Sequence, residues 1–205
     1  MSTVDTPALL AATTKDLADR FDGVHSADTV ARYVADSYVA LHRTAFGDSR
    51  LPELTKRFAA DRLTALAPAD DADRTPSVLF ICIHNAGRSQ TAAALMDHHA
   101  DGAVRVHSAG SQPAATVSKS AAAVLAERGL TLDDAYSKPI TAEILTSADV
   151  VVIAGGGEAV PRLPGPRYET WDLPHPPGDD LDGISAVRDE IDTRVQALLN
   201  QLTTH

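Results

Sequence analysis

The sequence predicts an α/β protein in which a four-stranded, parallel, doubly wound sheet follows a small bundle of three helices. The N-terminal third has helical periodicity and no strand-like run, whereas short apolar runs alternate with helical segments from residue 77 onwards. Such alternation implies right-handed crossovers and a parallel sheet that binds ligands at the carboxyl ends of its strands. We therefore expect a three-helix bundle over 1–70, a sheet domain over 77–205 and a small, polar, proline-flanked linker at 71–76.

The bundle is predicted from three amphipathic segments, 7–21, 27–44 and 52–66, in which apolar side chains recur on one face. Ser26 or Asp28 is suited to cap the second segment, because short polar side chains accept hydrogen bonds from the first turn of a helix. These segments contain no catalytic motif, so we expect the chemistry to reside in the sheet domain.

In the sheet domain, the apolar run Ser77–Cys82 is typical of a strand buried on both faces. The other expected strands are 104–108, 149–154 and 167–173, and the expected helices are 88–100, 117–128 and 184–202. No window approaches the run of about 20 apolar residues that a membrane-spanning helix needs, and the first residues lack a basic flank and an apolar core. We expect a cytoplasmic protein with no membrane partner.

Charge and cysteine content exclude several classes of function. A formal net charge of -10 and a pI near 5.1 oppose nonspecific binding of nucleic acid, which requires a basic surface. Cys82 is the single cysteine, so neither an intramolecular disulfide nor a thiolate cluster for zinc can form. His98, His99 and His107 do not have metal-binding spacing, and we expect no metal site.

The strongest motif lies where the first strand turns into a helix. Its residues are Cys82, Ile83, His84, Asn85, Ala86, Gly87, Arg88 and Ser89. The backbone from Cys82 through Arg88 can wrap around a tetrahedral oxyanion with its N–H groups inward, while the following helix adds its positive end. Arg88 supplies a two-pronged fork for two anion oxygens. The motif therefore predicts an oxyanion-binding loop.

Cys82 is the expected nucleophile of this loop. A helix N-terminus and a guanidinium can lower the pKa of a cysteine from about 8.5 to roughly 3.5–7.5, and the thiolate is the reactive form. Ser89 can donate a hydrogen bond to the sulfur, Asn85 can brace the loop, and His84 either contacts the substrate or only shapes the backbone. A cysteine that ends an apolar strand is commonly inert, but the arginine six residues later favours a catalytic role.

This C-x5-R-S motif resembles the low-molecular-weight tyrosine phosphatase superfamily, and its His84-Asn85 form is most similar to the arsenate reductase branch. The resemblance covers about 77–202 and includes the stretches 108–111, 138–141 and 168–174. The helical N-terminal segment resembles an extension found in some actinobacterial arsenate reductases. The resemblance implies a phosphatase-like sheet domain and the thiol-dependent reduction of arsenate.

Two departures from the family pattern affect the expected chemistry. Thioredoxin-coupled relatives carry two relay cysteines after the third strand, where this chain has Gly156 and Val160. Resolution of a sulfur–arsenic adduct on Cys82 therefore needs an external thiol such as mycothiol, glutathione or a redoxin, as in the transferase-like members of the family, and we expect no tightly bound cofactor. The family aspartate that precedes a proline and donates a proton is replaced by His175, which leaves His175 and Asp172 as candidates.

Three functions follow from these residues. The first is an arsenate reductase or arsenate–thiol transferase, with arsenate or a similar oxyanion, a low-molecular-weight thiol and a redoxin as partners. The second is a phosphatase acting on phosphotyrosine or a small phosphomonoester, which shares the first half-reaction. The third is a noncatalytic module that binds or senses oxyanions. A homodimer is left open.

Overall fold

The computed structural model describes residues 6–44, 49–67, 75–156, 159–176 and 180–204. The chain divides into two compact units, Met1–Ala69 and Asp70–His205. Most of the expected linker, residues 71–74, lies outside the described residues.

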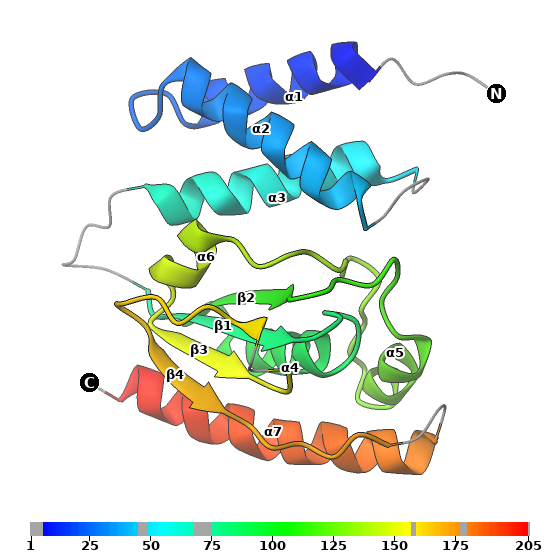
Figure 1. Cartoon of the computed structure of the whole chain (residues 1–205). Helices are drawn as coiled ribbons and strands as arrows, with labels where there is room; N and C mark the ends of the chain where they lie inside the picture. Colours follow the sequence, from blue (N-terminus) through cyan, green and yellow to red (C-terminus); the bar gives the residue numbers. More distant parts are fainter. Residues whose placement is uncertain (1–5, 45–48, 68–74, 157–158, 177–179, 205) are drawn as a thin grey trace. The chain divides into compact units, whose positions relative to one another are not determined.

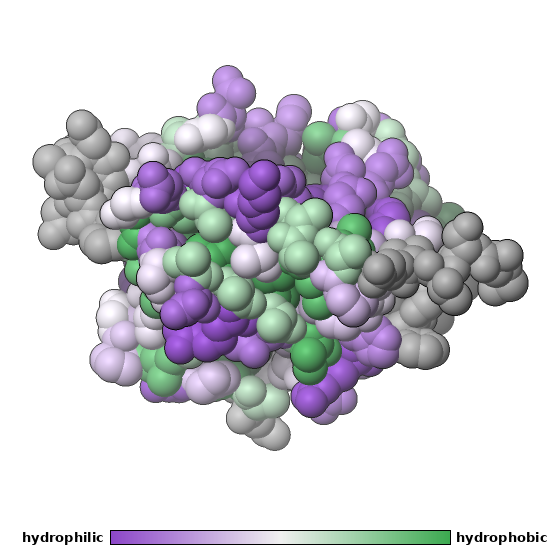
Figure 2. Space-filling model, turned by 90° about the horizontal axis from the view of Figure 1, so that it is seen from above, coloured by the Kyte–Doolittle hydropathy of each residue, from purple (hydrophilic) through white to green (hydrophobic). Residues whose placement is uncertain are grey.

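The first unit contains the three expected helices. They are α1 (Thr6–Arg20), α2 (Ala27–His42) and α3 (Leu51–Leu66). The Ser26 hydroxyl caps α2 by accepting a hydrogen bond of 3.2 Å from the Thr29 N–H. Buried Leu17, Val34 and Leu63 belong to the shared core of the helices, as the amphipathic pattern predicts. In the view from above, the surface of the protein is mainly hydrophilic and contains several hydrophobic areas (Figure 2).

The second unit confirms the predicted parallel, doubly wound sheet (Figure 1). Its strands are β1 (Ser77–Cys82), β2 (Arg105–Gly110), β3 (Val150–Ile153) and β4 (Arg167–Thr170), in the order β2-β1-β3-β4, and all neighbours are parallel. Its helices are α4 (Arg88–Ala100), α5 (Lys119–Ala126), α6 (Ala142–Ser147) and α7 (Leu181–Thr203). Every residue of the central strands β1 and β3 is buried, because helices lie on opposite sides of the sheet.

The core of this unit forms where β1 and β3 pack against α4 and α7. Phe80, Met96, Val152 and Ile191 are all buried in it. The Phe80 ring lies 5.7 Å from the ring of Trp171, which anchors the segment after β4. This packing fixes β1 and α4, and with them the turn that joins the two elements. No helix in the described ranges is both long and apolar enough to cross a membrane.

Most elements end within a few residues of the expected positions, and three differences from the sequence prediction have a local reason. α6 was not expected, because six residues are too few to show helical periodicity. β4 ends at Thr170 rather than residue 173, since it is an edge strand with β3 as its one neighbour. α5 begins at Lys119 rather than 117, because the Ser118 hydroxyl accepts a hydrogen bond from the Ala121 N–H and caps the helix there.

Candidate active site

The candidate site lies at the carboxyl end of β1, where the chain turns into α4. Cys82 is the last residue of β1, Arg88 is the first residue of α4, and residues 83–87 form the loop between them. Since β1 lies between β2 and β3, the loop is flanked by the segments that leave both neighbouring strands. This is the edge at which doubly wound sheets bind ligands.

The carbonyl groups of the loop are turned outward by hydrogen bonds. The donors are Ser111 N–H to Cys82 O (3.3 Å), Gln112 N–H to Ile83 O (2.8 Å), Ala114 N–H to His84 O (2.9 Å) and Ser118 N–H to Ala86 O (2.9 Å). In the described part of the chain, no group accepts a hydrogen bond from the N–H groups of residues 84–88. The N–H groups are therefore left for a ligand, next to the positive end of α4, which is the arrangement that binds anions.

Asn85 holds the centre of this loop. It is fully buried and has φ of 48°, a left-handed conformation that asparagine tolerates better than most residues. Its backbone carbonyl accepts a hydrogen bond of 2.9 Å from the Ser137 hydroxyl. Its side-chain oxygen accepts hydrogen bonds from the Lys138 N–H (3.0 Å) and from Gln90 Nε2 (3.2 Å). The side chain thus ties the loop to α4 and to the segment after α5.

The Ser89 hydroxyl lies 3.0 Å from Cys82 Sγ. Asn85 Nδ2 donates a hydrogen bond of 2.9 Å to the same hydroxyl oxygen, which leaves the Ser89 proton available for the sulfur. Cys82 is 4% exposed and Ser89 is fully buried, so water does not compete for this contact. A hydroxyl that donates to the sulfur stabilises the thiolate, the form that acts as a nucleophile.

Two glycines after β3 pack directly on the loop. Gly155 has φ of +111°, and a Cβ built there would lie 2.7 Å from Nη1 of Arg88. Gly156 has φ of +72°, and a Cβ there would overlap the Ile83 side chain. Both positions therefore need glycine for backbone conformation and for space. The close approach places the Arg88 guanidinium beneath the β3 loop.

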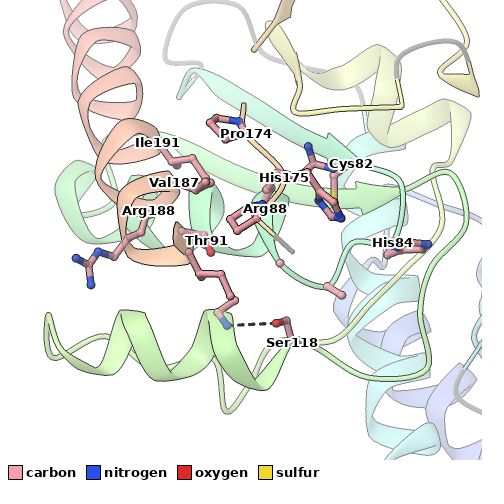
Figure 3. A pocket seen from close by; sticks show the side chains of 15 residues that line it. Cys82, His84, Arg88, Thr91, Ser118, Pro174, His175, Val187, Arg188 and Ile191 are labelled. Atoms are coloured by element: carbon pink, nitrogen blue, oxygen red, sulfur yellow. Dashed lines mark hydrogen bonds between the residues drawn. The ribbon is translucent and has the colours of Figure 1, made fainter. Parts of the chain in front are cut away.

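The loop opens into a cavity of about 230 Å³ (Figure 3). Its lining residues are Cys82, His84, Ala86, Gly87, Arg88, Thr91, Ser118, Ala121, Pro174, His175, Pro176, Ile184, Val187, Arg188 and Ile191. The Arg188 guanidinium points away from Cys82 and donates to Val124 O (2.6 Å) and Glu127 Oε2 (2.7 Å). One wall is therefore apolar, and no Phe, Tyr or Trp of the described residues lines the cavity.

One of the two candidate proton donors, His175, lines the cavity that contains Cys82. His175 is exposed and lines the cavity with Cys82 and Arg88. Asp172 lines a neighbouring pocket instead, together with Glu190 and His175. His84 lines the cavity but lies apart from the other labelled side chains in Figure 3. The structure thus brings Cys82, Arg88 and His175 to one cavity and leaves Asp172 outside it.

Sequence reasoning missed the residues behind the loop. Gln90, Ser137 and the side chain of Lys138 contact Asn85 or its partners, yet no spacing rule identifies them. Ser108 and Lys138 fall within stretches that carry the family resemblance, and this was the one available signal. Within the described ranges, no group of three or more His, Cys, Asp or Glu side chains could hold a metal ion.

A buried cysteine, a run of loop N–H groups and an arginine lie together at a strand-to-helix turn and form a candidate cysteine-dependent oxyanion site. Residues 77–205 match the family described as low molecular weight phosphotyrosine protein phosphatase, and residues 10–67 match the one described as protein-tyrosine-phosphatase-like, N-terminal domain. The chain belongs to the low molecular weight phosphotyrosine protein phosphatase family.

Individual relatives include both reductases and a phosphatase. The thioredoxin-dependent arsenate reductase of Corynebacterium glutamicum is 40% identical, with a TM-score of 0.84 over 95% of this chain and 96% of that chain. A glutaredoxin arsenate reductase of Synechocystis is 29% identical over 62% of this chain and 98% of its own. An arginine phosphatase of Geobacillus stearothermophilus is 27% identical, with a TM-score of 0.54 over 62% and 92% of the two chains.

Proposed function

We propose that this protein is an arsenate reductase in which Cys82 is the nucleophile and an external thiol completes the reduction. The observation that carries the proposal is the loop itself, whose carbonyls are turned outward so that its N–H groups and Arg88 can surround an oxyanion beside the Cys82 sulfur. The two reductases among the relatives support arsenate as that oxyanion.

In the first step, the Cys82 thiolate attacks arsenic and displaces one oxygen, which leaves as water after protonation. A sulfur–arsenic bond forms, and arsenic remains pentavalent. Arg88 and the N–H groups stabilise the charge on the remaining oxygens. His175 is the proposed proton donor, because it lines the cavity that contains Cys82 whereas Asp172 does not.

In the second step, an external thiol attacks the Cys82 sulfur and forms a mixed disulfide. The electron pair of the sulfur–arsenic bond leaves with arsenic, which becomes trivalent and departs as arsenite. A second thiol then attacks the mixed disulfide and restores Cys82. The net reaction consumes arsenate and two thiols and gives arsenite, one disulfide and water. Cys82 has to exchange with thiols from outside, because the chain has no other cysteine.

The cavity supports a small thiol as the first attacking group. Cys82 is 4% exposed at a cavity of about 230 Å³, which has room for a small molecule beside the oxyanion. A folded redoxin reaches such a sulfur less readily than a small thiol does. The thioredoxin dependence of the Corynebacterium relative supports a redoxin for the later disulfide exchange.

The test measures arsenite release with mycothiol, glutathione or thioredoxin alone, and with each small thiol followed by a redoxin. We expect turnover that depends on the concentration of a small thiol, none in Cys82→Ser, and a small-thiol adduct on Cys82 by mass spectrometry. Efficient turnover with thioredoxin alone would show that this order of thiols is wrong.

The second candidate is a phosphomonoester phosphatase, favoured by the family and by the arginine phosphatase relative. The cavity argues against phosphotyrosine, because none of its described lining residues is Phe, Tyr or Trp. Hydrolysis of p-nitrophenyl phosphate, measured beside arsenate turnover, separates the two activities. Rapid hydrolysis without arsenate reduction would favour the phosphatase, and oxyanion binding without either reaction would favour a sensor.

A further inference from the structure

We propose that Lys138 is a positioning residue whose ammonium group begins a one-way chain of hydrogen bonds that ends at Cys82. The chain keeps the Ser89 hydroxyl turned towards the sulfur. Its intermediate residues are Ser108 of β2, Gln90 of α4 and Asn85 of the loop. The inference deepens the proposed function, because it rests on Cys82 being the nucleophile.

The links of the chain are continuous in the structure. They join Lys138 Nζ to Ser108 Oγ (3.2 Å), Ser108 Oγ to Gln90 Oε1 (3.4 Å), Gln90 Nε2 to Asn85 Oδ1 (3.2 Å), Asn85 Nδ2 to Ser89 Oγ (2.9 Å) and Ser89 Oγ to Cys82 Sγ (3.0 Å). Every member after Lys138 is buried. Buried hydrogen bonds act in a low dielectric and do not exchange freely with water.

The direction of the first links follows from the chemistry of the donors. An ammonium group can only donate, so the Ser108 oxygen accepts from Lys138 and the Ser108 proton is free for Gln90 Oε1. Gln90 Nε2 faces three acceptors, which are Asn85 O (3.0 Å), Asn85 Oδ1 (3.2 Å) and Tyr136 O (2.9 Å). Its amide orientation is therefore determined by its surroundings.

The same reasoning fixes the last links. Asn85 Oδ1 accepts from the Lys138 N–H at 3.0 Å as well as from Gln90, so Asn85 Nδ2 must face Ser89. Ser89 Oγ accepts from that amide and donates its proton to Cys82 Sγ. Every link donates towards the sulfur. Because aligned hydrogen bonds polarise one another, the charge at Lys138 strengthens the final donor.

Two cations, Lys138 and Arg105, act on His107, and Lys138 is the one whose ammonium group donates to Ser108. It interacts with Asp97 of α4 and His107 of β2, and its Nζ lies 4.4 Å from the centre of the Tyr136 ring. Burial, with smaller effects from Lys138 and Arg105, lowers the pKa of His107 to about 4, so His107 is neutral at pH 7. Burial raises the pKa of Asp97, and Lys138 opposes that rise.

Alkylation of the full-length protein with iodoacetamide tests the chain without using arsenate. The reagent is uncharged and reacts with the thiolate of a single cysteine, so the rate reports on Cys82 alone. We expect Lys138→Met to slow alkylation at pH 7 by about fivefold, the equivalent of one net hydrogen bond. We expect Ser108→Ala, which removes a link but no charge, to have a similar effect. The matched control is Lys56→Met, which removes a surface lysine and leaves the rate unchanged.

A double-mutant comparison separates the hydrogen-bond chain from a general effect of charge or packing. In a Ser89→Ala background the last link is absent, so Lys138→Met should cause no further slowing. A through-space effect of the lysine would persist in that background. Equal slowing with and without Ser89, or parental rates in both Lys138→Met and Ser108→Ala, would overturn the inference. If Lys138→Met does not fold, the same cycle with Ser108→Ala decides. Failure of arsenate turnover with the alkylation pattern intact would count against the proposed reaction alone.

Discussion

Replacing Gly155 by alanine tests how the loop after β3 acts on the anion site. The added Cβ would lie 2.7 Å from Nη1 and 2.8 Å from Nη2 of Arg88. Such distances are too short to persist, and the guanidinium at the end of a flexible side chain is the group that moves. We therefore expect Arg88 to be displaced from the oxyanion while the rest of the loop keeps its hydrogen bonds.

The Gly155→Ala substitution should have two effects, a loss of folding stability and a loss of oxyanion affinity, which are measured separately. A φ of +111° is strained for alanine, and such strain costs about 1–3 kcal/mol in the free energy of unfolding. Loss of a hydrogen bond to a charged group costs about 1.5–3 kcal/mol, which corresponds to roughly ten- to hundredfold weaker oxyanion binding.

Gly165→Ala is the matched control, because Gly165 has nearly the same φ, +114°, but its Cβ would meet one atom, Thr146 O, at 3.9 Å. Both variants should lose similar stability in denaturant unfolding. Titration calorimetry with phosphate and arsenate should show weaker binding in Gly155→Ala alone. If the two variants bind oxyanion equally well, Gly155 does not position Arg88 and this reasoning is wrong.

Further predictions concern the anion fork, the proton donor, a half-buried histidine and the N-terminal unit. Arg88→Lys should bind phosphate at least about tenfold more weakly by calorimetry, because lysine keeps the charge but lacks the two-pronged contact; unchanged affinity would place Arg88 outside the anion site. His175→Asn should lower arsenate turnover while Asp172→Asn stays near the parent, and the reverse result would assign the proton donor to Asp172. The pKa of His107 is lowered by burial to about 4, so between pH 6.5 and 4 the unfolded chain binds a proton that the folded chain does not. As the pH falls from 6.5 to 4, this residue should lower the free energy of unfolding by on the order of 3 kcal/mol. The His107→Gln variant should show a smaller decrease when the free energy of unfolding is measured with urea at each pH. A chain that starts at Thr75 should fold by circular dichroism and bind phosphate, whereas an unfolded product would show that the helical segment completes the core.

The fold was largely predictable because its signals are local. The apolar run Ser77–Cys82 and the alternation that follows it predict buried parallel strands, and the structure contains them. α6 was missed because six residues carry too little periodicity. The sequence prediction for β4 runs to 173, but residues 171–173 extend past the end of the neighbouring strand.

The site was predictable to the extent that it is contiguous in sequence. Cys82, Arg88 and Ser89 lie within one strand-to-helix turn, so their spacing was enough to place them together. The contact between Gln90 and Tyr136 spans 46 positions and depends on a tertiary arrangement that no spacing rule describes. That His175 lines the Cys82 cavity and Asp172 does not was likewise not predictable, because it depends on how the segment after β4 passes α7.

The packing of Gly156 on Ile83 has a consequence for protein engineering. Restoring a relay cysteine at position 156 would require more than a new sulfur atom, since even its Cβ would collide with Ile83 and its backbone would have to leave φ of +72°. The β3 loop would need to open before any thiol there could approach Cys82. In this chain, the absence of an internal relay is therefore a property of the backbone as well as of the side chains. A redesign that lets an internal cysteine take over from Cys82, with an outside redoxin reducing the resulting disulfide, has to rebuild that loop first.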